Sequence, residues 1–335
     1  MSLRNLFGIL KIRRGRKQGH QVADDEAFEE AREEIQRALR RAHKLVKALQ
    51  LAGLTDEQAA RYHIICRPLT LRTDGGYSST ESVHFKPWPL LKLEQYPIDH
   101  SDKQTESDFK GHEAVFDNFN KDHQDDTIDE DDSDEDDSGD FLCNALVYEF
   151  VQYARKGHPS GNTLEHLSGW HEGDFDRKIL KGRYMDSAMH TDPSSDPLAS
   201  PSLTFEAVWY RTLPHELPHI SLIVSYEGLS DDNLLRSEVL TLIGIMRTRL
   251  GRTELKEHTV APVLMISCMG FLKARILQAH YTNGKLMVSK SPLHDFSTPE
   301  ARQKNIPLFL LYMCSECVGD TKTIVRETKM EDTNI

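Results

Sequence analysis

The sequence has few cysteines and no long apolar run. Its five cysteines are an odd number scattered over 335 residues, a usage typical of a reduced compartment rather than of a disulfide scaffold. No run of about 18 apolar residues is present, so we expect no transmembrane helix, and no apolar core of a signal peptide is visible. The sequence also lacks three common motifs of nucleotide binding and serine hydrolysis: a P-loop, a G-x-G-x-x-G fingerprint and a G-x-S-x-G motif.

Apolar residues are scarce as well. They make up 38% of the chain, below the usual share for a compact domain. The deficit is local, because residues 98–140 hold eighteen Asp and Glu against three Lys and no Arg. So dense a block of like charge predicts a disordered acidic linker over 98–140. The net charge of −12 therefore arises mainly from this segment and says little about the folded surface.

Acids are missing from the start of the chain, where residues 1–23 form a basic tail. The first twenty residues contain six Lys and Arg. Such a segment can be a mitochondrial transit peptide, a nuclear localisation signal, a helix on an anionic membrane surface or a solvated tail. The sequence thus leaves cytoplasm, nucleus and mitochondrion open. This tail is also the only strongly basic part through which nucleic acid binding would be expected.

Residues 24–66 are expected to form a helical hairpin. The segment from Asp24 to Leu51 begins with acids, ends with lysines and carries an apolar stripe, as a helix that packs on a neighbour does. Gly53 predicts its end, and Thr55 begins a second, short helix. The hairpin can pack on the main domain or, as a coiled coil, on another protein. Residues 67–97, with their Gly and Pro, predict an irregular segment.

Residues 141–325 predict an α+β domain with a mainly antiparallel mixed sheet and flanking helices, followed by a disordered tail over 326–335. Its clearest feature is Asn283-Gly284, a hairpin signal between two strand-like runs. Thr298-Pro299 begins a helix that we expect Pro307 to interrupt. The other predicted elements are a helix from Phe141, strands over 203–211 and 219–226, a helix over 230–250 and a buried strand over 261–268.

The hairpin offers a basic face and no obvious chemistry. Its polar residues have no acidic partner at a spacing that catalysis would need; they are Lys273, Arg275, Gln278, His280, Lys285 and Lys290. We therefore expect any site to lie on the loops that feed the sheet.

His215, Glu216 and His219 match the H-E-x-x-H pattern of zinc proteases. That chemistry needs both imidazoles on one helical face, with the glutamate beside the metal-bound water. Pro218 lies within the motif and disfavours a helix. We expect a turn between two strands, and the three residues stay weak catalytic candidates.

A second candidate is a histidine-rich loop that begins at residue 158. His158, His166, His171 and Glu172 are metal-ligand residue types on a segment rich in Gly and Ser. Their spacing fits no standard zinc pattern, so zinc is the cofactor to test rather than one that the sequence predicts.

Residues 203–325 resemble a group of uncharacterised proteins from filamentous fungi. The residues that carry the resemblance are A-P-V-L-M-I-S-C-M-G-F-L-K-A-R-I-L-Q-A-H-Y-T-N-G-K-L-M-V, S-P-L-H-D-F and V-G-D-T-K. The resemblance implies a fungal intracellular protein and assigns no catalytic residue. It also leaves open an accessory role in a biosynthetic pathway.

Two functional hypotheses follow. The first is a non-enzymatic intracellular binding or regulatory protein that acts through protein–protein contacts, with the helical hairpin or the acidic linker as the contact region. The second is a metal-assisted hydrolase that uses one of the two histidine groups.

Overall fold

A mixed sheet of eight strands organises the protein. The computed structural model describes residues 4–76, 83–122, 138–157, 162–173, 179–181, 184, 203–210, 217–226, 228 and 232–323. Seven strands follow the order β2-β10-β9-β8-β6-β5-β4, and β11 pairs with β9 beside them. The pairs β2–β10 and β6–β8 are parallel and the other pairs are antiparallel. The predicted α+β class with a mainly antiparallel mixed sheet is confirmed.

The strands of this sheet are short to medium in length. Their bounds are β2 Ile64–Pro68, β4 His171–Gly173, β5 Leu203–Tyr210, β6 Ile220–Tyr226, β8 Val263–Met269, β9 Lys273–Thr282, β10 Lys285–Lys290 and β11 His294–Asp295. Two small pairs lie outside it: β1 Gly53–Leu54 with β7 Leu234–Leu235, and β3 Phe85–Lys86 with β12 Glu316–Cys317. The β9–β10 turn is as predicted, because Asn283 and Gly284 have φ of 48° and 71°.

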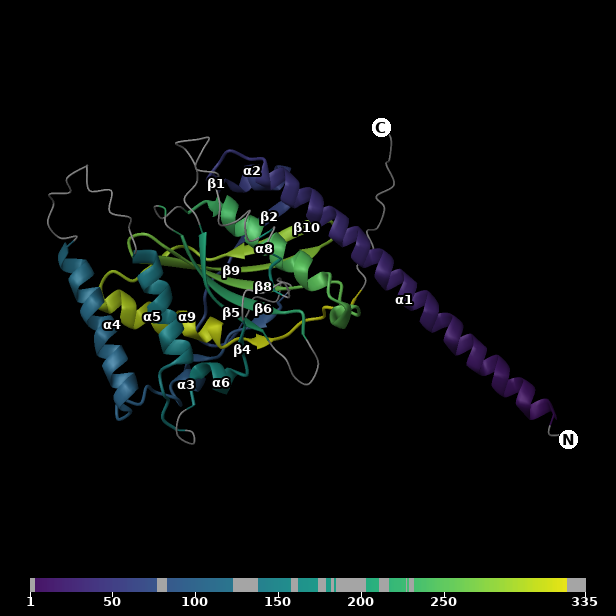
Figure 1. Cartoon of the computed structure of the whole chain (residues 1–335), viewed down its shortest axis with the longest axis horizontal. Coiled ribbons are helices and arrows are strands. Elements are labelled where there is room, and N and C mark those ends of the chain that lie inside the picture. Colours follow the sequence, from purple (N-terminus) through teal and green to yellow (C-terminus); the bar gives the residue numbers. More distant parts are fainter. Residues whose placement is uncertain are drawn as a thin grey trace.

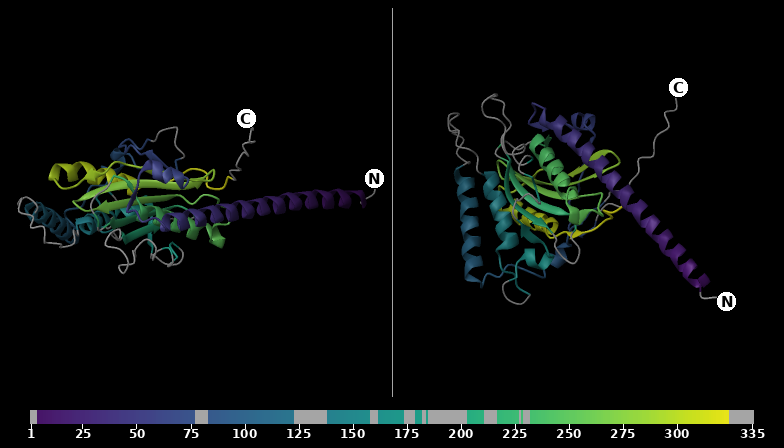
Figure 2. Two further views of the ribbon diagram at one scale, coloured as in Figure 1. Left: turned by 90° about the horizontal axis from the view of Figure 1, so that it is seen from above. Right: turned by 45° about the vertical axis from the view of Figure 1, so that its right-hand side comes forward.

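Helices α1 (Arg4–Lys47) and α8 (Arg236–Leu250) cover one face of the sheet (Figure 1). Leu39 and Val46 of α1 are fully buried in a cluster with α8 and with Leu286 of β10. The first part of α1 continues away from the sheet as the same helix, as Figures 1 and 2 show. The apolar stripe that predicted this helix therefore packs on the main domain.

Helices α5 (Ser138–Val151), α6 (Leu164–Ser168) and α9 (Pro299–Met313) cover the opposite face, and α3 (Leu90–Leu93) packs on α9. Their apolar side chains meet strands β5, β6 and β8 and the first half of β9. Phe150 of α5, for example, lies edge-on to Trp209 of β5, with ring centroids 5.1 Å apart. The second half of β9, together with β10 and β2, presents polar side chains on this face.

The segment 24–66 contains more than the two expected helices. The second helix, α2 (Asp56–Arg61), begins at Thr55, whose side chain accepts a hydrogen bond from the Gln58 amide. The chain then turns into β2, which forms an edge of the main sheet by pairing with β10. This segment thus contributes a strand to the same sheet as residues 203–295.

Part of the predicted acidic linker is helical, which corrects that expectation. Helix α4 spans Lys103–Asp122, whereas residues 123–137, with the densest acidic block, lie outside the described residues. Phe116 of α4 is buried against Phe141 of α5, with ring centroids 4.5 Å apart. Arg302 of α9 lies 3.6 Å from Glu113 and offsets part of the acidic charge. Packing on α5 and α9 therefore outweighs the repulsion that composition alone suggested.

Helix α9 runs through Pro307, where we expected an interruption. Proline leaves the carbonyl four residues earlier without its helical partner. That carbonyl belongs to Gln303, an exposed residue that water can reach. Phe309 and Leu310 on the next turn are buried and hold the helix against the sheet.

Among the described residues, no helix is both long and apolar enough to cross a membrane.

Candidate binding site

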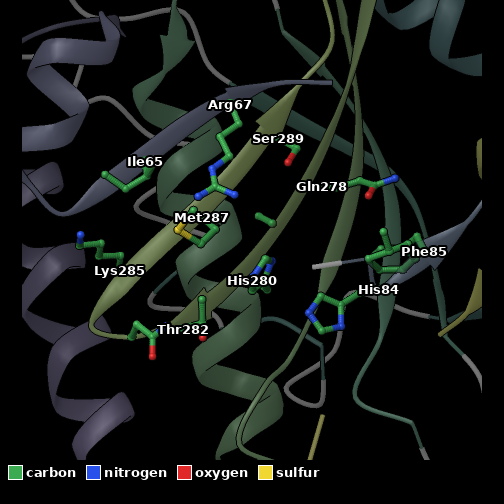
Figure 3. A pocket seen from close by; sticks show the side chains of 13 residues that line it. Ile65, Arg67, His84, Phe85, Gln278, His280, Thr282, Lys285, Met287 and Ser289 are labelled. Carbon is green, nitrogen blue, oxygen red and sulfur yellow. The ribbon is translucent and has the colours of Figure 1, made fainter. Parts of the chain in front are cut away.

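A cavity of about 330 Å³ lies over the outer strands β2, β10 and β9 (Figure 3). It opens on the face whose other half is covered by α5 and α9. In the part of the chain that the structure describes, thirteen residues line it: Ile65, Arg67, Val83, His84, Phe85, Gln278, Ala279, His280, Thr282, Asn283, Lys285, Met287 and Ser289. The cavity is therefore built on the hairpin itself and not on the loops where we expected a site.

Strand register arranges the floor of the cavity in three rows. Residues paired across neighbouring strands point to the same face of a sheet. Ile65 of β2 pairs with Met287 of β10, which pairs with His280 of β9, and this makes a mainly apolar middle row. The two rows on either side of it carry the positive charges.

The first charged row contains Arg67, Ser289 and Gln278, and the second contains Lys285 and Thr282. Leu286 and Val288, which alternate with these residues on β10, point the other way into the core under α1 and α8. The alternation of polar and apolar residues on the hairpin is thus the local reason for the cavity. One strand face builds the core while the other presents binding groups.

His84 and Phe85 line the cavity from outside these three strands. β3 holds them through its pairing with β12, and the Val318 amide donates to the His84 carbonyl at 3.0 Å. The ring of His84 lies edge-on to that of His280, with centroids 4.7 Å apart, as Figure 3 shows. His84 and His280, which are almost 200 residues apart in the sequence, therefore lie side by side in the lining of the cavity.

Gly319 makes this approach possible. Its φ is +80°, and a Cβ added there would lie 2.5 Å from the Val83 carbonyl oxygen and 2.9 Å from His84 Nδ1. Glycine is the residue that adopts such a conformation without steric cost. The turn after β12 can thus pass directly beside the His84 ring.

The histidines around the cavity are neutral at pH 7. Burial lowers the pKa of His84 to about 4, and burial together with the neighbouring His84 and Arg67 lowers the pKa of His280 to about 3. A neutral imidazole offers one hydrogen-bond donor and one acceptor. His84 is 7% exposed, and its Nδ1 has no hydrogen-bond partner among the described residues. The pair therefore supplies polar but uncharged contacts.

Two exposed cations line the cavity. Arg67 and Lys285 are exposed, and no ion pair joins either of them to a described residue. Among the described residues that line the cavity, none is Asp or Glu. With Met287, Ile65 and Phe85 as apolar neighbours, the cavity combines two cations with an apolar centre.

Of the predicted H-E-x-x-H residues, the structure describes His219. His215 and Glu216 lie outside the described residues. His219 is 2% exposed at the start of β6, and its Nε2 lies 3.1 Å from the Val318 carbonyl oxygen. Burial lowers its pKa to about 3. The His219 ring packs against the rings of Phe85 and His84 and so helps to position two residues that line the cavity.

The predicted histidine loop is described in part. His158 lies outside the described residues, whereas His166 is in α6 and His171 and Glu172 are in β4, all three exposed. His166 Nδ1 lies 3.0 Å from the Thr163 hydroxyl, and the Glu172 amide donates to the Glu165 carboxylate at 2.6 Å. In the described ranges, no three His, Cys, Asp or Glu side chains gather closely enough to hold a metal ion.

Comparisons with known proteins give no relative. No protein-family model matches the chain, and neither curated proteins nor solved structures provide a match. The resemblance to fungal proteins over residues 203–325 therefore stays a prediction. The function has to be argued from the geometry of the cavity.

Proposed function

We propose that the protein is a non-enzymatic binding protein that acts through contacts with another protein. The proposal places the contact at the cavity over β2, β10 and β9. Its main support is that two exposed cations, neutral imidazoles and an apolar centre line one cavity, with no Asp or Glu among the described lining residues. These groups match an acidic segment that also carries an apolar side chain.

The shape of the site favours a segment rather than a flat surface. The cavity is bounded on one side by Val83–Phe85 and is about the size at the lower end of ligand pockets. A few side chains of an extended chain can enter it, and Met287 can adapt to them because its thioether side chain is flexible and polarizable. The two exposed cations that line it would steer an acidic partner and orient it.

Selection from a random peptide library displayed on phage tests this proposal with the purified full chain. We expect selected peptides to bind the wild-type protein, with binding weakened about tenfold or more by the double change Arg67→Glu and Lys285→Glu. Arg40→Glu with Lys304→Glu is the matched control, because it makes the same charge change at exposed positions of α1 and α9. The proposal fails if no peptide is selected, or if the cavity and control variants bind equally well.

A further inference from the structure

The register of β10 specifies the spacing of the backbone positions that carry the two charges. Lys285 and Ser289 are four residues apart on this strand, and Arg67 of β2 pairs directly with Ser289. Four residues of a strand span roughly 13 Å at a rise of 3.3 Å each. The two cations therefore start from opposite ends of the cavity, with the Ile65–Met287–His280 row midway between them.

An extended segment that lies along β10 has the same repeat. Its side chains alternate between the two faces, so those at positions i, i+2 and i+4 point toward the cavity and the outer two lie about 13 Å apart. The end positions meet Arg67 and Lys285, and the middle position meets Met287 and Ile65. Charge complementarity requires acids at both ends, and the middle row requires an apolar side chain.

We infer that the cavity recognises an extended protein segment of the pattern acidic-x-apolar-x-acidic. This inference rests on the proposed function and adds the chemistry and spacing of the partner. His84 and His280 add uncharged polar contacts across the middle of the segment. Arg67 and Lys285 have no Asp or Glu among the described lining residues beside them, so both charges are available to such a partner.

Designed peptides test the spacing. The probe GSETVTESG carries the pattern, GSTEEVTSG has the same composition with adjacent acids, and GSKTVTKSG has the reversed charge. We expect the first to bind the full chain at least about tenfold more tightly than the second, as two well-placed charge pairs permit. The third should not bind measurably. Fluorescence polarisation of labelled peptides gives the dissociation constants.

A charge swap identifies which contact each acid makes. Arg67→Glu should weaken binding of GSETVTESG, and one of the two peptides GSKTVTESG and GSETVTKSG should restore it, because one end of the segment lies against residue 67. The other of these two peptides should instead restore binding to the Lys285→Glu variant. Arg40→Glu, on the helix that packs on the opposite face of the sheet, should leave the preference for GSETVTESG over GSKTVTESG and GSETVTKSG unchanged.

The outcomes separate the two proposals. If both acidic peptides bind equally and both depend on Arg67 and Lys285, the spacing is wrong and the binding function stands. If library peptides bind through the cavity but GSETVTESG does not, the acidic pattern is wrong. If inorganic phosphate at millimolar concentration displaces GSETVTESG while bromide of equal ionic strength does not, the site recognises a small anion and the inference is overturned. If no peptide binds through the cavity, both proposals fail.

Discussion

Arg32 of α1 caps the C-terminal end of α8, and Arg236 of α8 caps the C-terminal end of α1. Arg32 of α1 donates to the carbonyls of Leu250 and Leu255, at and beyond the end of α8. Arg236 at the start of α8 donates to the carbonyls of Val46 and Lys47, at 3.2 Å and 2.8 Å, where α1 ends. The last carbonyls of a helix lack helical partners and carry its negative dipole end, so both arginines are favourably placed.

This reciprocal capping gives the first prediction. Arg32→Ala should lower the free energy of unfolding by about 1–3 kcal/mol, because it leaves buried carbonyls without a donor. Arg236→Ala should cost less, because its Nη2 contact is exposed. Arg37→Ala removes an exposed arginine from the same helix and should change stability by less than about 0.5 kcal/mol. Urea unfolding measures all three, and equal effects of Arg32→Ala and Arg37→Ala would contradict the capping role.

The caps also show what the sequence could not predict. Helix α1 was predictable because its apolar stripe and charged ends are local. Its partner was not, because Arg32 and the end of α8 are separated by more than 200 residues. The same holds for α4, whose burial depends on Phe141 and Arg302 and not on its own acidic composition.

The cavity was hidden for a similar reason. The β9–β10 hairpin was predictable from Asn283 and Gly284, and its basic residues were visible. Its apolar neighbour Ile65 comes from a strand that pairs in parallel at long range, and His84 arrives through β3 and β12. Long-range strand pairing leaves no local periodicity, so residue type alone pointed to the exposed histidines of α6 and β4 instead.

Glu238 and Arg275 form an ion pair that is fully buried and gives the second prediction. The guanidinium meets both carboxylate oxygens, at 2.6 Å and 3.0 Å, and neither side chain is exposed. Removal of one partner leaves a buried charge unpaired, so Arg275→Met should lower the free energy of unfolding by about 3–5 kcal/mol. Glu238→Gln should also destabilise the protein. Glu238 accepts a second hydrogen bond, from the Leu235 amide at the start of α8, and this change disturbs that bond as well.

The double change completes this test. Arg275→Met with Glu238→Gln should cost less than the sum of the two single changes, because no isolated charge is left. Thermal and urea unfolding of the four proteins form a double-mutant cycle. Additive effects would show that the two side chains stabilise the fold independently, against the observed geometry.

Gly319 supplies the third prediction, which links stability to the cavity. Gly319→Ala places a methyl group against the Val83 carbonyl and the His84 ring at a φ of +80°. We expect a loss of about 1–3 kcal/mol from strain at a conformation that side chains rarely adopt. Because the displaced ring borders the cavity, peptide binding should weaken as well.

A glycine elsewhere provides the control. A Cβ added at Gly111 of α4 meets nothing within 4 Å. Gly111→Ala should therefore stabilise the protein by up to about 1 kcal/mol through helix propensity, without an effect on binding. A Gly319→Ala variant with normal stability and binding would show that the turn after β12 does not hold His84.

The buried histidines make stability depend on pH in a defined direction. An imidazole has a pKa near 6.5 in the unfolded chain, whereas burial lowers it to about 4 for His84 and about 3 for His219 and His280. Between pH 4 and 6.5 the unfolded state thus binds more protons than the native state. The free energy of unfolding should therefore rise with pH through this window and level off above about pH 7.

His219→Gln tests this dependence at the most buried of the three histidines. The amide can keep a hydrogen bond to the Val318 carbonyl while the titration is removed. Stability at pH 7 will fall from imperfect packing, so the readout is the slope of unfolding free energy against pH between 5 and 6.5, which should become shallower. His171→Gln on the exposed strand β4 should leave the slope as it is. An unchanged slope in His219→Gln would mean that this imidazole takes up its proton equally in both states.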